Sequence, residues 1–292
     1  MNKLILCLIL TLASPSAASD FVSASHFFPV VSRTTGLAGT HWTTAVQIVN
    51  PQPDDLMITA RLSSGGTFQT ETIVVPAGET HGWPDFLGDV FGAEGNAALF
   101  LEADAASNQN RPPECRAFAA SMRISTEGDD GGSFGQGVPS LDPVAGFLGD
   151  WTAYFPAVAL WGQAGNDGFR TNVGFWNIGT DDAQLRLRLL EASGRQVWQQ
   201  LVTIHRHDPF IMSLPTDIDL ETATLVVETL GEWLDCAVYI SVVDNTTGDA
   251  SFQTSQLMDP DSAVACGLGV NSKPNPAHSP VRLRALFLGE EQ

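Results

Sequence analysis

The chain has 292 residues, and its 33 acidic side chains outnumber 14 lysines and arginines, giving a formal net charge of -19. This balance disfavours binding to nucleic acid or anionic lipid, because both depend on cationic side chains that neutralise phosphates. Hydrophobic residues make up 43% of the chain and charged residues 16%, a composition typical of a packed globular protein, and the length favours two domains.

The first predicted element is a secretory signal peptide. Lys3 precedes an apolar stretch over residues 4–12, and small residues follow over 13–19. The stretch is far shorter than the roughly 20 residues that a membrane-spanning helix needs. We expect residues 1–19 to be removed, with cleavage before Ser19 or Asp20. The mature chain is then secreted or periplasmic, without membrane insertion.

Two parts of the following sequence repeat one another. The segment that begins at Phe28 aligns without a gap with the segment that begins at Phe155. Identical pairs along this match are Thr44/Thr171, Val46/Val173, Asn50/Asn177, Asp54/Asp181, Asp55/Asp182 and Arg61/Arg188. A period of about 120 residues suits a sandwich domain rather than a solenoid unit. We therefore expect one domain over residues 20–148, a second over 149–262, and a C-terminal tail over 263–292.

Each copy is predicted to consist of β-strands. Ile58, Ala60 and Leu62 alternate with polar residues, and residues 185–189 alternate in the same way. Glycine and proline clusters punctuate the strands, and only residues 86–91 and 217–222 resemble short helical turns. The expected fold is all-β, with two tandem antiparallel β-sandwiches of immunoglobulin-like type.

Several of these segments also form a recognisable set. They are Phe28–Val31, Trp42–Asn50 with its repeat Phe169–Asn177, the Pro76–Gly78 turn, and Ser241–Asp249. The set resembles uncharacterised tandem β-sandwich repeat domains of secreted bacterial proteins. The resemblance covers nearly all of residues 28–260. It implies a fold and no activity, because that group offers no catalytic residues to carry over.

One motif suggests hydrolase chemistry. Residues 131–135 fit the Gly-x-Ser-x-Gly pattern, with Ser133 in the place of the nucleophile. A nucleophile elbow needs a helix after the serine, whereas Gly137 and Pro139 follow here. The second copy keeps only Ser251 and Phe252, so we favour a structural role for the serine-phenylalanine pairs.

Metal binding has two weak candidates. His205 and His207 lie two residues apart and could provide part of a zinc or copper site, although an exposed hairpin explains them better. Asp244, Asn245 and Asp249 offer oxygen ligands in a loop that calcium could use. Tight β-connections also use Asx and glycine residues, so a simple turn is the favoured interpretation and no cofactor is required.

Aromatic side chains raise the possibility of glycan binding. Trp161 and Trp83 fall in or near predicted loops, where an indole could stack on a sugar ring. Core packing is nevertheless the favoured interpretation, most strongly for Trp42 and Trp176 within predicted strands.

Three cysteines remain after the predicted cleavage. We expect Cys236 to pair with Cys266 in the oxidising compartment, and Cys115 to stay a buried thiol. A Cys115–Cys266 bridge across both copies is the alternative.

These patterns leave three classes of function open. The favoured one is an exported non-catalytic structural, adhesive or interaction module whose partner is a protein or glycan at the cell surface. A glycan-binding accessory module is the first alternative. A cryptic hydrolase is the second, and it would need acid, base or nucleophile groups gathered in one cleft.

Overall fold

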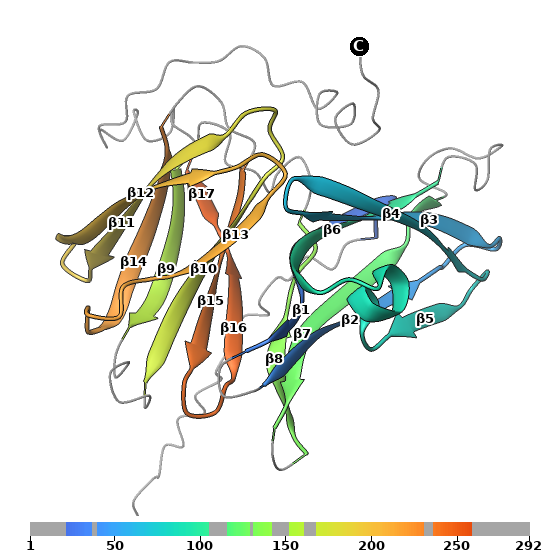
Figure 1. The fold of residues 1–292 in the computed structure, drawn as a ribbon, viewed down its shortest axis with the longest axis horizontal. Helices are drawn as coiled ribbons and strands as arrows, with labels where there is room; N and C mark the ends of the chain where they lie inside the picture. Colours follow the sequence, from blue (N-terminus) through green and yellow to red (C-terminus); the bar gives the residue numbers. More distant parts are fainter. Residues whose placement is uncertain are drawn as a thin grey trace, which may run out of the picture.

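The computed structural model describes residues 22–36, 40–104, 116–128, 131–141, 152–160, 168–230 and 236–258. The predicted signal peptide, both expected boundaries near 148 and 262, and the tail lie outside these residues. Strands dominate the described part, and all of their pairings are antiparallel, which confirms the all-β sandwich (Figure 1). No helix among the described residues has the length and apolar character needed to cross a membrane.

The first half of the chain forms two layers. Its strands are β1 (Ser25–Thr35), β2 (His41–Val49), β3 (Leu56–Ser64), β4 (Thr67–Val75), β5 (Thr80–Trp83), β6 (Gly95–Ala103), β7 (Ala119–Glu127) and β8 (Ser133–Gly137). One layer has the order β4-β3-β6-β1, and the other joins β5, β2, β7 and β8. β1 pairs with β6 along most of its length and with β2 only at Thr34 and Thr35, so it links the two layers.

The second half has the same strand order, with one strand more. Its strands are β9 (Thr152–Leu160), β10 (Phe169–Asn177), β11 (Ala183–Glu191), β12 (Gln196–Ile204), β13 (Pro209–Ser213), β14 (Leu220–Thr229), β15 (Cys236–Asp244), β16 (Ala250–Thr254) and β17 (Gln256–Met258). One sheet runs β12-β11-β14-β9-β17 and the other β13-β10-β15-β16. Strands β9–β16 therefore occupy the places of β1–β8.

Alternating burial explains why these segments form strands. Leu56, Ile58, Ala60 and Leu62 of β3 are buried, while the residues between them are exposed or half-buried. β11 shows the same period of two. The inward side chains of the two layers meet in an apolar core in each half, and Tyr239 of β15 and Phe252 of β16 also pack with the first core.

Local turn chemistry positions the hairpins. β3 and β4 are joined by Gly65 and Gly66, both with positive φ, as a two-residue turn of the favoured hairpin type requires. The predicted helical turn at 86–91 is confirmed as a single π-helical turn, η2 (Leu87–Phe91). The second expected helical turn, at 217–222, is wrong, because strand β14 already begins at Leu220.

A third apolar cluster joins the two halves. Its members are Phe27, Ala98, Phe100, Leu141, Trp176, Ile178 and Ala237, all buried. Phe27 and Phe100 lie on the outer face of the β1–β6 pair, because their neighbours Phe28 and Leu99 face the first core. Trp176 and Ala237 lie on the outer face of β10 and β15. Outer faces from the two halves therefore pack against each other, as the two bodies side by side in Figure 1 indicate.

Candidate functional site

The residues shared by the two halves have structural roles. The Thr44 hydroxyl donates to the Ser32 carbonyl and accepts from the Ser32 amide, so it ties β2 to β1 at 2.8 and 2.7 Å. Thr171 makes the matching bond to the Ala159 carbonyl at 2.9 Å. Both threonines are fully buried, which explains why each copy needs a hydroxyl at this point.

The repeated asparagines close the loop that follows β2 and β10. The Asn50 side-chain amide donates to three backbone carbonyls at 2.9–3.1 Å, and its oxygen accepts from the Gln52 amide. Asn177 repeats the arrangement, donating to the carbonyls of Asp181 and Ile204 and accepting from Gly179. Their conservation between the halves therefore follows from folding, without any need for a ligand.

The serine of the hydrolase motif lies on a strand. Ser133 begins β8, and the residues after it continue as strand, which agrees with the structural interpretation. A Cβ at Gly135 would collide with the Ile124 carbonyl oxygen, so close packing of β8 on β7 requires the glycine. In the second half, Phe252 stacks on Tyr239 with ring centroids 4.9 Å apart.

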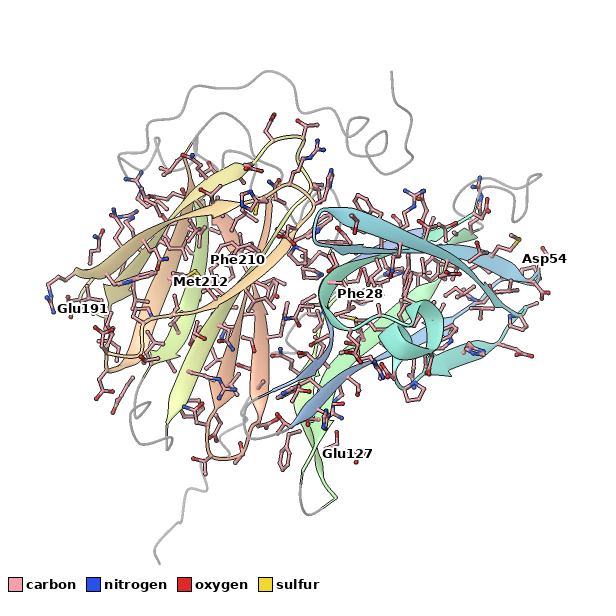
Figure 2. The ribbon with its side chains drawn as sticks, in the orientation of Figure 1. Phe28, Asp54, Glu127, Glu191, Phe210 and Met212 are labelled. Atoms are coloured by element: carbon pink, nitrogen blue, oxygen red, sulfur yellow. The ribbon has the colours of Figure 1, made fainter. Side chains whose placement is uncertain are left out.

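Trp83 packs against the first apolar core. It pairs with Val46 at the end of β5, is half-buried, and packs edge-on against the buried Phe86 at 5.3 Å. His81 lies against it at 4.3 Å. In the second half, Met212 pairs with the equivalent Val173, and Figure 2 shows it on β13. Trp161 lies outside the described residues, so the two tryptophans are not seen as one sugar-binding surface.

The loop proposed for calcium is a hydrogen-bonded turn. The Asp244 carboxylate accepts from the backbone amides of Thr246 and Thr247, and the Thr246 bond in particular holds the pKa of Asp244 below its usual range. The Asn245 side-chain oxygen accepts from the Arg170 guanidinium. Two of the three candidate ligands are thus already engaged, as the turn interpretation expects. Asp249 contributes its backbone carbonyl to the Asp244 amide.

The two histidines have different partners. His205 is exposed and its Nδ1 lies 2.9 Å from Asp182, which lowers the pKa of that carboxyl. His207 instead turns toward the first half, where its ring contacts Phe68 at 5.1 Å. Among the described residues, no three His, Cys, Asp or Glu side chains gather in a group able to hold a metal ion.

The thiol of Cys236 is buried in the second core. Cys115 and Cys266 lie outside the described residues. The expected Cys236–Cys266 bridge therefore stays a prediction, as does its alternative.

The junction between the halves is the surface that motif analysis missed. Trp176 contacts Phe27 and Phe100, with ring centroids 4.8 Å from each, and its indole N–H donates to the Ser63 hydroxyl at 3.3 Å. Ser63 donates in turn to the His207 carbonyl at 2.8 Å. The Gly65 amide donates to the Asp208 carboxylate at 3.1 Å.

A signal for this junction exists in the strands themselves. Residues 97–101 of β6 are apolar at consecutive positions, and all five are buried. A strand that is buried on one face alternates, whereas an uninterrupted apolar run indicates burial on both faces. β1 shows the same feature at Phe27 and Phe28. This pattern could have revealed the docking face.

Comparisons with known proteins establish no family. No family model and no curated protein matches the chain. Structural neighbours include a protein assigned as secreted from Parabacteroides distasonis, 12% identical over 77% of this chain and 82% of its own, with a TM-score of 0.23. The PBSX exported protein XepA is 8% identical over 76% and 84%, also at 0.23. A Pleurotus ostreatus lectin in complex with GalNAc is 11% identical over 82% and 77%, at 0.17. Such scores carry no argument about function.

Proposed function

We propose that this chain is an exported, non-catalytic structural, adhesive or interaction module built from two tandem copies of one sandwich. The equal strand order of the halves supports the duplication. Their assignment to the immunoglobulin-like class stays a prediction. Its location would be secreted or periplasmic, and its partner would be a protein or glycan at the cell surface.

The main support for the proposal is that the residues identical in the two halves have structural roles. Four of these side chains are buried and form hydrogen bonds with backbone groups of their own halves: Thr44, Thr171, Asn50 and Asn177. The feature retained in both copies is therefore a scaffold. A duplicated scaffold leaves its loops and outer faces to vary for binding, which is how rigid sandwiches usually present recognition surfaces.

The packing of the halves supports the same function. A module that transmits force or presents a surface benefits from a fixed relation between its domains. Trp176 and Phe27 provide one through an apolar junction that resembles a core more than a flexible linker.

Export is tested by expressing the full chain in a bacterial host and fractionating the cells. The mature protein should leave the cytoplasm, and its intact mass should equal that of a chain starting at residue 19 or 20. Retention of Met1 on the exported protein would contradict the predicted cleavage.

Binding is tested with the purified mature chain on intact bacterial cells and on a glycan array. If the chain is a binding module, it should bind cells saturably and remain bound after washing. It should not hydrolyse generic esterase or glycosidase substrates. Array binding that a Trp83→Ala variant loses would favour the glycan-binding alternative. Substrate turnover abolished by Ser133→Ala would favour the hydrolase, and Ser251→Ala provides the matched control.

A further inference from the structure

Two strands hold equivalent places at the ends of their sheets. β4 ends the sheet of the first half and β12 the corresponding sheet of the second. Within the described part of the chain, β4 pairs only with β3, and β12 only with β11. Each strand has nine residues, and each presents a row of backbone groups on its outer edge. Such an edge is a template for a further strand unless something guards it.

The two edges differ at their central residue. Glu71 is opposite Ala60 in the β3–β4 pair, and Gln200 is opposite Leu187 in the β11–β12 pair. Ala60 and Leu187 are equivalent in the internal repeat, so Glu71 and Gln200 are equivalent too. The first half therefore has a carboxylate at the middle of its edge, and the second half has a neutral amide.

β12 carries no charge at any position from Gln196 to Ile204. The chain as a whole has one acidic residue for about every nine, so a neutral nine-residue edge stands out. Leu201 on this strand is 62% exposed, more than any other large hydrophobic side chain in the described residues. An exposed, neutral and partly apolar edge without proline lacks the usual protection against strand addition.

We propose that β12 pairs with β12 of a second copy of this chain, antiparallel and about a two-fold axis at Gln200. The pairing would join two five-stranded sheets into one continuous sheet. Trp198 would then lie opposite the second copy's Val202, an aromatic and β-branched pair of the kind that stabilises sheets. Gln200 would face its own counterpart, and Leu201 would be covered by the second copy's Gln199.

Of the two edges, β12 is the one at which charge opposes a second copy less. Two chains of net charge -19 repel each other, so their contact must avoid acidic side chains. Beside β12, Arg186 and Arg188 share Glu228 and Arg195 pairs with Glu191, while the Asp182–His205 pair lies at the far end of the strand. No residue of β12 itself is acidic. The same two-fold operation on β4 would instead place Glu71 against its counterpart, which is destabilising.

The start of β12 lies away from the first half. Glu191 lies at the end of β11 and begins the turn into β12, and Figure 2 places it at the side of the second half that faces away from the first. The other end of β12, at Ile204, lies three residues before His207, which contacts Phe68 of the first half, so the second copy would extend toward the junction.

The test is sedimentation velocity of the mature chain over a hundred-fold range of concentration. The wild-type chain is expected to show a reversible monomer–dimer equilibrium. Gln200→Glu introduces the residue that β4 carries at the equivalent position and should raise the dimer dissociation constant at least ten-fold. Leu201→Lys should act in the same direction. Glu71→Gln, the matched control on β4, should leave the constant unchanged.

Hydrogen exchange locates the contact. Amides of residues 196–204 should exchange more slowly at dimer concentrations than at monomer concentrations, while amides of residues 67–75 should not change. A chain that stays monomeric at the highest concentration would overturn the proposal. A dimer that survives Gln200→Glu and Leu201→Lys, or that protects β4 instead, would also overturn it. None of these outcomes bears on export or on the partner of the module.

Discussion

The junction between the halves predicts a specific thermodynamic behaviour for Trp176→Ala. Trp176 is fully buried between Phe27 and Phe100 and donates a hydrogen bond to Ser63. Truncation of a buried tryptophan to alanine costs about 3–5 kcal/mol through lost transfer energy and the cavity that remains. Loss of the two aromatic contacts and of the Ser63 bond places this variant toward the upper end of that range.

The effect should appear as uncoupling rather than as uniform loss. The wild-type halves share the junction, so we expect them to unfold in one cooperative calorimetric transition. In Trp176→Ala the junction weakens while most of each core is unchanged, so the transition should divide into two. A fall of the first midpoint by about 10 °C corresponds to about 4 kcal/mol for a chain of this size.

Trp83→Ala provides the matched control, because that indole is half-buried and its ring contacts among the described residues are with His81 and Phe86 of its own half. Its transition should move down while remaining single. If Trp176→Ala costs less than about 1 kcal/mol, or if it lowers a single undivided transition, the junction does not couple the halves and the reasoning is wrong.

Three further predictions follow from single contacts. Asn50→Ala leaves three loop carbonyls without their donor and should cost about 3 kcal/mol in urea unfolding, whereas Asn172→Ala, whose bond is exposed, should cost less than about 1 kcal/mol. Gly174→Ala drives a Cβ into the Tyr239 ring, so its cost should fall by at least about 1 kcal/mol when measured in a Tyr239→Ala background. Burial lowers the pKa of His207, so the unfolded chain binds more protons just below pH 6.5, and stability should fall as the pH drops through that window. His207→Asn, which tolerates the positive φ there, should remove part of this slope; an unchanged slope would contradict it.

The predicted sandwich followed from local pattern, and the structure confirms it. Ile58, Ala60 and Leu62 face the core because strand side chains alternate, and that period is legible in the sequence. The repeat placed Thr44 with Thr171 and Asn50 with Asn177, and their matching hydrogen bonds show why the pairs recur. Their roles were not predictable, because the carbonyls they bind belong to neighbouring strands and loops.

The candidate sites were harder to predict, because a binding site depends on distances between residues that are remote in sequence. His205 and His207 are two residues apart, yet their side chains contact Asp182 and Phe68 respectively. The positive φ of His207 breaks the extended backbone that would have put both rings on one face. Its position in the sequence makes Trp83 a candidate for sugar stacking from a loop. In the structure it ends β5, which pairs with β2, and its ring packs edge-on against Phe86.

The sequence by itself determined the strands, their inward faces and the internal match between two segments, because these depend on residue period and on direct alignment. The docking of the halves was decided only by the tertiary structure. Phe27, Phe100 and Trp176 point away from the cores of their own halves, and an outward apolar side chain can face water, a second domain or another chain. Which of these it meets depends on how whole sheets pack, and that packing joins residues more than a hundred positions apart, such as Trp176 and Ser63.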